Sequence, residues 1–225
     1  MKRGGTQRIP RPPDARPGGL PPWAHLAPAE RRIPLARVRE RFADVPPPVA
    51  ANAELITPDS RDAAVLIAVF EDGGESHVIL TKRPETMPSH RGEIAFPGGK
   101  RDPSDPSLEA AALREAQEEV GLDPATVDVI AQLDSLGTVA TQFTIAPFLG
   151  LLPGPPLLVP EPHEVVDAFA VPVSELLDPE AYTEERWHLF GDWRSMAFFH
   201  LPGETVWGAT ARILTRFLEH LTASR

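Results

Sequence analysis

Residues 96–122 read FPGGKRDPSDPSLEAAALREAQEEVGL, a stretch that predicts a glycine turn followed by one helix. We expect the helix to begin with Asp105 as its N-cap and Pro106 as its first residue, because proline's fixed φ suits a helix start. Gly121 marks the expected end. The apolar stripe of this helix, which would pack on a core, consists of Leu113, Ala116 and Val120.

Three carboxylates occupy the opposite side of the predicted helix. Glu115, Glu118 and Glu119 stand at i, i+3 and i+4, positions that share one helix face about 5 to 6 Å apart between Cβ atoms. Because like charges held this close repel, we expect a cation among them, and hard oxygen ligands favour Mg²⁺ or Mn²⁺. Before the helix, Gly98 and Gly99 allow main-chain groups to approach a metal or a phosphate. The alternative is a solvated helix face without a ligand.

The spacing of these residues resembles a known motif. Gly99, a gap, and REAQEEVGL at residues 114–122 resemble the Nudix box, in which G, five residues, E and seven residues precede REUXEEXGU. In that family the box forms a loop and helix that bind divalent metal and hydrolyse a nucleoside diphosphate linked to another group. The resemblance implies an α/β fold, a Nudix-type α/β/α sandwich with a mixed β-sheet. It also implies that the three glutamates bind metal and act in catalysis, while Arg114 orients them.

A second resemblance concerns one branch of the family. The first box glutamate is missing, and Asp102 and Asp105 resemble the GGxxDxxD variant of the coenzyme A pyrophosphatases. LTKR at residues 80–83 and HRGEIAFPGG at 90–99 resemble the upstream signature of that branch, although Pro84 replaces its serine. This implies cleavage of coenzyme A or acyl-coenzyme A to 3′,5′-ADP and (acyl-)phosphopantetheine. The alternatives are another nucleoside diphosphate derivative such as ADP-ribose, or a catalytically silent module that binds a nucleotide.

Cations near the box are the expected substrate ligands. Lys82, Arg83 and Arg91 flank the predicted strand end and could offer positive charge to the diphosphate, together with main-chain groups of Gly98 and Gly99. Glu164 and Asp167 are expected to be surface carboxylates, with a further metal ligand or a base as the alternative. His90 and His163 lack ligand spacing, and neither is assigned to the metal.

Composition narrows the partners. The 225 residues carry a net charge of −10, which argues against a nucleic-acid surface but not against a phosphorylated small molecule held through a metal. There is no cysteine, which excludes disulfides and thiolate sites. Residues 1–28 lack the apolar run of a signal peptide or membrane span, and together with the absence of cysteine this makes a cytoplasmic location the expectation. The oligomeric state stays open, with a homodimer as one possibility.

The chain divides into an arm and a domain. Residues 1–28 are rich in proline, glycine and arginine without apolar periodicity, so we expect a disordered arm. Residues 29–225 form the expected Nudix hydrolase domain. Within it the apolar patterns predict a hairpin of strands 63–70 and 77–81, and two further strands, 127–136 and 143–152, joined by 137–141. They also predict a strand followed by helical turns within 163–177 and an aromatic hairpin in 186–201. Helices are expected over 35–42 and from about 206 to 221.

Overall fold

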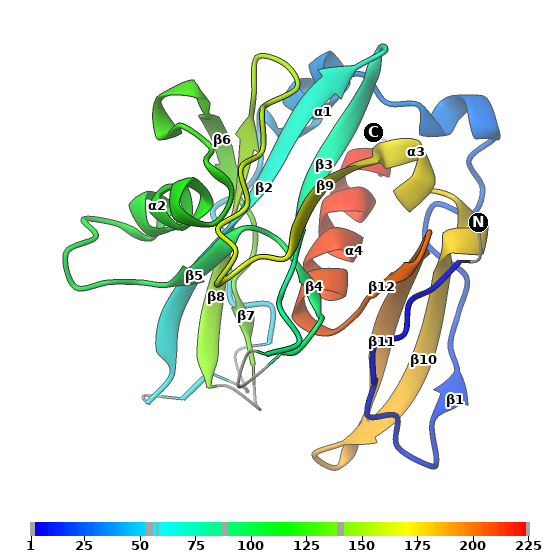
Figure 1. Cartoon of the computed structure of the whole chain (residues 1–225). Helices are drawn as coiled ribbons and strands as arrows, with labels where there is room; N and C mark the ends of the chain where they lie inside the picture. Colours follow the sequence, from blue (N-terminus) through cyan, green and yellow to red (C-terminus); the bar gives the residue numbers. More distant parts are fainter. Residues whose placement is uncertain (1–2, 53–55, 58, 87–89, 139–141, 224–225) are drawn as a thin grey trace.

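The computed structural model describes residues 3–52, 56–57, 59–86, 90–138 and 142–223. Its larger sheet contains β2 (Arg61–Asp72), β3 (Glu75–Lys82), β4 (Ile94–Ala95), β5 (Gly98–Lys100), β6 (Asp128–Gln132), β7 (Leu136–Gly137), β8 (Phe143–Leu151) and β9 (Asp167–Pro172). The main order is β4-β3-β2-β8-β6, while β5, β7 and β9 pair with β2, β8 and β3 (Figure 1). Strands β2 and β8 run parallel and the other pairs run antiparallel. The predicted mixed sheet is confirmed.

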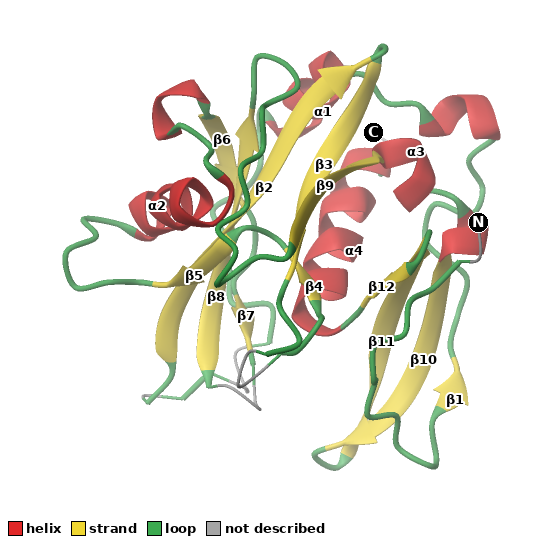
Figure 2. Cartoon of the chain, in the orientation of Figure 1, coloured by secondary structure: helices red, strands yellow, loops and turns green. Residues whose placement is uncertain are grey.

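Helices lie on both faces of this sheet (Figure 2). Successive side chains of a strand point to opposite faces, and β2 serves two cores in this way. Leu66 and Ala68 belong to the core beneath α2 (Leu108–Val120), whereas Ile67 and Val69 belong to the core that contains α4 (Gly208–Thr222). The predicted α/β/α sandwich, with the box helix on one face and the C-terminal helix on the other, is therefore confirmed.

The remaining helices are short. α1 (Leu35–Phe42) has the predicted bounds and lies on the α4 side, where the rings of Phe42 and Phe217 stack with centroids 5.5 Å apart. α3 (Val173–Leu176) follows β9, as the sequence predicts. Within the described residues, the 3₁₀ helices η1 (Pro28–Arg31), η3 (Pro124–Thr126) and η4 (Pro179–Ala181) connect larger elements. Among the described helices, none has the length and apolar character that a bilayer span requires.

Strands β2 and β3 form the predicted hairpin but separate away from their turn. They pair only over residues 69–72 and 75–78. Beyond this, the far end of β2 pairs with β5 and the far end of β3 pairs with β4, while the Leu66 N–H donates to the Pro97 carbonyl at 2.8 Å. The glycine-rich stretch is therefore inserted where the two strands diverge, which brings it beneath α2.

The expected strand at 127–136 is divided. The structure has β6, a register shift between Val129 and Ala131, and then the separate strand β7. The break falls where the Leu133 N–H donates to the Pro147 carbonyl outside the regular ladder. In the expected connection 137–141, residues 139–141 lie outside the described residues.

A second sheet stands beside the first. Its strands are β1 (Arg16–Pro17), β10 (Tyr182–Leu189), β11 (Asp192–Leu201) and β12 (Glu204–Val206), in the order β1-β10-β11-β12. The aromatic hairpin that the sequence predicts is confirmed in β10 and β11, which turn at Phe190 and Gly191. The hairpin rests on the α4 side of the molecule, because Tyr182 and Phe199 belong to the same core as the helix.

The N-terminal segment differs from the disordered arm expected for residues 1–28. β1 pairs with β10, and the guanidinium of Arg3 forms ion pairs with Glu175 and Asp178. Trp23 is fully buried, with its ring 5.4 Å from that of Tyr182. The segment is ordered because its arginines find carboxylates on the domain and its tryptophan enters the core. Both are contacts with residues far along the chain that local periodicity does not reveal.

Candidate active site

The box helix begins two residues later than the sequence predicts. Ser107 is the N-cap of α2, and its hydroxyl accepts from the Ala110 N–H at 3.0 Å. Asp105 is not the cap, because its carboxylate accepts instead from Arg114. The predicted end is confirmed at Gly121, whose φ of 72° is left-handed and whose N–H donates to the Gln117 carbonyl.

Three carboxylates converge beside this helix. Glu115 and Glu119 extend from α2, and Glu164 comes from the loop that precedes β9. Each offers an oxygen, and these oxygens all lie within 4.8 Å of one another. Hard oxygen donors in such a group suit Mg²⁺ or Mn²⁺, whereas without a cation their negative charges oppose one another. The donor set therefore fits a divalent metal.

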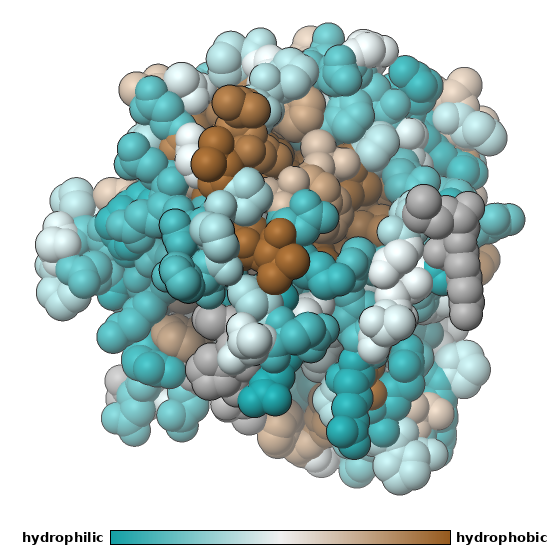
Figure 3. Space-filling view, viewed as in Figure 1, coloured by the Kyte–Doolittle hydropathy of each residue, from teal (hydrophilic) through white to brown (hydrophobic). Residues whose placement is uncertain are grey.

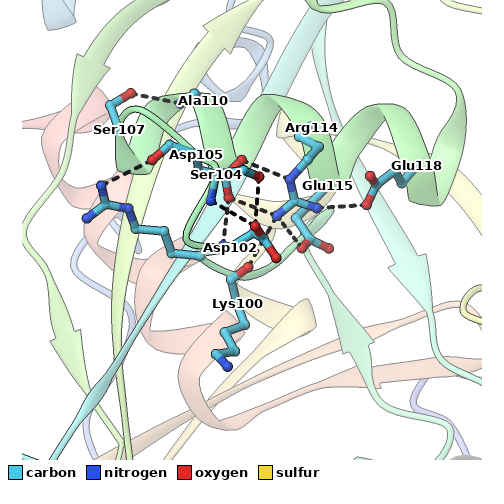
Figure 4. A network of polar contacts seen from close by, with 10 residues as sticks. Lys100, Asp102, Ser104, Asp105, Ser107, Ala110, Arg114, Glu115 and Glu118 are labelled. Atoms are coloured by element: carbon cyan, nitrogen blue, oxygen red, sulfur yellow. Dashed lines mark hydrogen bonds and ion pairs between the residues drawn. The ribbon is translucent and has the colours of Figure 1, made fainter.

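The structure does not bring Glu118 into this group. Its carboxylate lies at the outer edge of α2, where it accepts from Arg114 at 2.7 Å (Figure 4). The side chain is 55% exposed, against 15% for Glu115 and 4% for Glu119. Two of the three box glutamates, Glu115 and Glu119, therefore belong to the converging group, whereas Glu118 lies outside it, exposed to solvent and paired with Arg114.

Burial raises the pKa values of Glu115 and Glu119. The pKa of Glu119 is raised to about 7, chiefly because burial disfavours the charged form, while a hydrogen bond from the Gly98 N–H and the charge of Arg83 oppose the rise. The pKa of Glu115 is also raised, again first by burial and against the effect of Arg114. Glu164 adds like charge to both. A cation placed among these groups would favour their ionised forms.

The two glycines before the helix permit the close approach of these carboxylates. The Gly98 N–H donates to Glu119 Oε2 at 3.0 Å, and a Cβ at residue 98 would lie 2.4 Å from the Ala64 carbonyl. A Cβ at Gly99 would lie 2.4 Å from Glu115 Oε2. The main chain here is strand β5 rather than the expected open turn. A side chain at either position would displace the strand or the glutamates.

Arg114 links the residues around the helix start (Figure 4). Its Nε and Nη2 donate to the two oxygens of Asp105 at 2.9 and 3.0 Å, and it also donates to Glu115, Glu118 and the Lys100 carbonyl. These bonds lower the pKa of Asp105, first through the Arg114 hydrogen bond, and raise the pKa of Arg114. Asp102 connects to the group through its N–H, which donates to Asp105. Arg114 thus lies where it can orient Glu115, the role that the family resemblance implies.

Glu164 is the residue that the sequence did not place at the site. Its loop is attached to the end of α2, where the Val159 N–H donates to the Val120 carbonyl and the Glu161 N–H donates to the Glu119 carbonyl, both at 2.9 Å. Glu164 is exposed, as expected of a surface carboxylate, and its oxygen also lies within 4.8 Å of those of Glu115 and Glu119, so the alternative of a further metal ligand stays a prediction. No periodic or motif signal marks this position, because its place depends on β9 pairing with β3.

One of the three expected substrate cations, Arg83, lies beside the carboxylates. Arg83 Nη1 is 3.8 Å from Glu119 Oε1, and its buried Nε has no hydrogen-bond partner among the described residues. Lys82 pairs with Glu204 of β12. Arg91 is exposed beside Gly92. Of the three expected substrate cations, Arg83 is therefore the one with an ion pair to a carboxylate of the group among the described residues.

The loop that carries Glu164 also exposes apolar side chains. Leu157, Val159 and Val166 are 85%, 59% and 61% exposed. On the face shown in Figure 3, hydrophobic residues gather in the upper and central part among hydrophilic neighbours. The loop that carries Glu164 therefore exposes apolar side chains as well as a carboxylate.

Comparison with known proteins agrees with this geometry. The model of the NUDIX domain matches residues 60–193. A Photorhabdus laumondii subsp. laumondii protein called uncharacterized Nudix hydrolase NudL is 34% identical over 190 residues, which cover 84% of this chain and 98% of that protein. The Cronobacter sakazakii protein of the same name is 39% identical over 156 residues, which cover 69% of this chain and 80% of that protein. A solved MutT/nudix family protein from Enterococcus faecalis shares the fold with a TM-score of 0.50 at 13% identity, over 79% of this chain and 64% of that one. The chain therefore belongs to the Nudix family of hydrolases.

Proposed function

We propose that this Nudix hydrolase cleaves the diphosphate of coenzyme A or an acyl-coenzyme A, giving 3′,5′-ADP and (acyl-)phosphopantetheine. The observation that carries the hydrolytic part is the convergence of Glu115, Glu119 and Glu164 within 4.8 Å. The choice of coenzyme A is supported by the signature at residues 80–83 and 90–99. An acyl group finds support in the exposed apolar side chains of the loop that carries Glu164.

Glu115, Glu119 and Glu164 would hold Mg²⁺ or Mn²⁺. When bound, the ion would neutralise diphosphate charge and make a water more acidic. Glu118 lies outside the group of converging oxygens and is 55% exposed, so we assign it a smaller share of the metal affinity. Water then attacks one phosphorus, and the bridging oxygen leaves with the other phosphate. Arg114 keeps Glu115 in place through the 2.9 Å contact between them.

The proposed phosphate ligands lie on the β3 side. Arg83 combines a buried guanidinium nitrogen that lacks a partner in the described structure with a position 3.8 Å from Glu119, so a phosphate oxygen there would complete its hydrogen bonds. Main-chain groups of Gly98 and Gly99 would lie beside the same phosphates. Arg91 and Lys82 are proposed for the 3′-phosphate, and Lys82 must exchange its contact with Glu204 to take part.

The test is a panel of diphosphate substrates assayed with Mg²⁺ and with Mn²⁺, with products identified by mass. The panel contains coenzyme A, a long-chain acyl-coenzyme A, dephospho-coenzyme A and ADP-ribose. Charge-assisted hydrogen bonds to the 3′-phosphate contribute about 1.5 to 3 kcal/mol, so we expect kcat/KM for coenzyme A to exceed that for dephospho-coenzyme A by about 10- to 150-fold. Equal rates on these two, or faster cleavage of ADP-ribose, would replace coenzyme A by a broader nucleoside diphosphate activity.

Carboxylate variants test the site itself. Glu115→Gln, Glu119→Gln and Glu164→Gln should each lower kcat by at least about 10²-fold, because each removes a charge that holds the metal. Glu118→Gln should have a smaller effect. Glu109→Gln, an exposed carboxylate in the first turn of the same helix, is the matched control and should keep parental activity. Parental turnover in the Glu115 and Glu119 variants would refute the assignment.

A further inference from the structure

The N-terminal segment reaches the wall of the candidate site through one side chain. Gln7 Nε2 donates to the Gly92 carbonyl at 3.3 Å and to the Glu204 carboxylate, and Gln7 Oε1 accepts from the Thr205 N–H at 3.1 Å. The amide thus uses its donor and acceptor ends together. It joins the segment before the domain to β12 and to the loop of residues 90–93.

Two of these contacts lead to Arg83 by separate routes. Glu204 also binds Lys82 Nζ, one residue before Arg83. Gly92 directly precedes Glu93, whose carbonyl accepts from the Arg83 N–H at 3.0 Å. Both the side chain before Arg83 and the main chain opposite it are therefore connected to Gln7. Arg83 in turn lies 3.8 Å from Glu119.

The placement of Gln7 is fixed by its own segment. The Gly4 N–H donates to the Leu201 carbonyl at 2.9 Å, and the Gly5 N–H donates to Thr205 Oγ1 at 3.0 Å. A Cβ at Gly5 would lie 2.1 Å from Gln7 Oε1 and 2.8 Å from the Gly203 carbonyl. The absence of a side chain at residue 5 thus lets the Gln7 amide fold back over the turn between β11 and β12.

We infer that Gln7 is a positioning residue for Arg83, acting through Glu204 and Lys82 on one side and through the Gly92–Glu93 main chain on the other. Gln7 has no hydrogen bond to Glu115, Glu119 or Glu164 among the described residues, and in the proposed function it does not contact the substrate. Its consequence for substrate binding rests on that proposed function, whereas its hold on the Arg83 main chain does not. The N-terminal segment would then be part of the substrate-binding wall, although it precedes the matched NUDIX domain.

The experiment compares the full-length parent with Gln7→Ala, Gln7→Glu and the control Arg11→Ala. Arg11 belongs to the same segment but contacts Glu185 and the ring of Phe198, on the second sheet. The first measurement is hydrogen exchange at the Arg83 amide, which reports directly on its bond to Glu93. Loss of one or two hydrogen bonds should speed this exchange by about 3- to 10-fold in Gln7→Ala. Gln7→Glu keeps an acceptor for Thr205 but adds a carboxylate that competes with Glu204 for Lys82, so its effect should be at least as large.

The second measurement is steady-state kinetics on the best substrate of the panel. Because Arg83 is proposed to bind the ground state and the transition state alike, KM should rise by about 3- to 10-fold in both Gln7 variants, with kcat within about twofold of the parent. Arg11→Ala should leave both the Arg83 exchange and KM unchanged, even where its melting temperature falls. A purely structural role would affect the Gln7 and Arg11 variants in the same way.

Unchanged Arg83 exchange in both Gln7 variants would overturn the inference, as would an equal increase in Arg11→Ala. A kcat loss with constant KM would also overturn it, because positioning of a phosphate ligand predicts the reverse. If the parent cleaves no substrate of the panel, the proposed function fails, and the exchange measurement still decides whether Gln7 holds Arg83.

Discussion

At the scale of single residues, the buried carboxyl of Glu119 predicts how stability depends on pH. Its pKa is raised from 4.5 to about 7, first by burial, so the native state binds this proton more tightly than the unfolded chain. The stability that the group contributes is therefore fully present below about pH 4.5 and is lost as pH rises through about 7. A shift of this size corresponds to on the order of 3 kcal/mol. We expect the melting temperature of the metal-free protein to fall between about pH 5 and 8, and Glu119→Gln to remove much of that fall.

The comparison with the variant separates Glu119 from groups outside the site, while Glu115, whose pKa is also raised by burial, remains in both proteins. The pKa of His90 is raised, first by its hydrogen bond to Glu93, so the stability that this group contributes is also lost as pH rises. This loss is the same in the parent and in the variant. The lowered pKa of Asp105 acts only at more acidic pH. Saturating Mg²⁺ should flatten the parental profile, since a cation favours the ionised carboxyl. Identical profiles for parent and variant without metal would contradict the raised pKa.

The same scale shows what helical spacing can and cannot predict. The positions of Glu115 and Glu119 on one face follow directly from the helical period, and the structure brings both together. Glu118 shares that spacing, yet Arg114 draws it outward. Glu164 shares no spacing with them and joins only through strand pairing. Spacing along one element therefore predicts neighbours on that element, whereas a ligand from another segment depends on the tertiary fold.

At the scale of elements, the N-cap of α2 allows a direct test of what fixes the start of the helix. Ser107 caps the helix through its hydroxyl, so Ser107→Ala should lower the free energy of unfolding by about 1 kcal/mol. Ser104→Ala is the matched control, because Ser104 is exposed and its hydroxyl contacts only Asp102, outside the helix. Urea unfolding monitored by circular dichroism measures both. A larger loss in the Ser104 variant would show that the turn, rather than the cap, fixes the helix start.

The error in the predicted cap has a physical cause. Asp105 and Ser107 both suit an N-cap, and local rules cannot choose between them. Arg114 decides the outcome, because it takes both oxygens of Asp105 into a bidentate contact nine residues away. Asp105 thus anchors the arginine that contacts Glu115, while the hydroxyl of Ser107 caps the helix. Tertiary contacts also decide the conformation of Gly98 and Gly99, which form strand β5 rather than a turn because they pair with β2.

At the scale of the whole molecule, local patterns predict the elements but not all of their associations. The hairpin of β2 and β3, the helix α4 and the aromatic hairpin are each present as predicted, since their signals lie within a few residues. The packing of the N-terminal segment is not predictable in this way. Arg3 meets Glu175 across 172 positions of sequence, and its charge pattern alone resembles that of a solvated tail.

This packing predicts a cost for truncation. Deleting residues 1–16 removes the Arg3 ion pairs with Glu175 and Asp178, the Arg11 contact with Glu185 and the Arg11 guanidinium over the Phe198 ring. Partly exposed ion pairs and cation–π contacts contribute about 0.2 to 1 kcal/mol each, so the deletion should cost about 1 to 4 kcal/mol and lower the melting temperature by several degrees. Differential scanning calorimetry measures this change. The matched pair Arg3→Ala and Arg8→Ala locates the cause, because Arg8 is exposed and forms no ion pair with the described residues. An unchanged melting temperature after the deletion would mean that the segment contributes no net stability, whereas equal losses in the two point variants would assign the effect to net charge rather than to the Arg3 contacts.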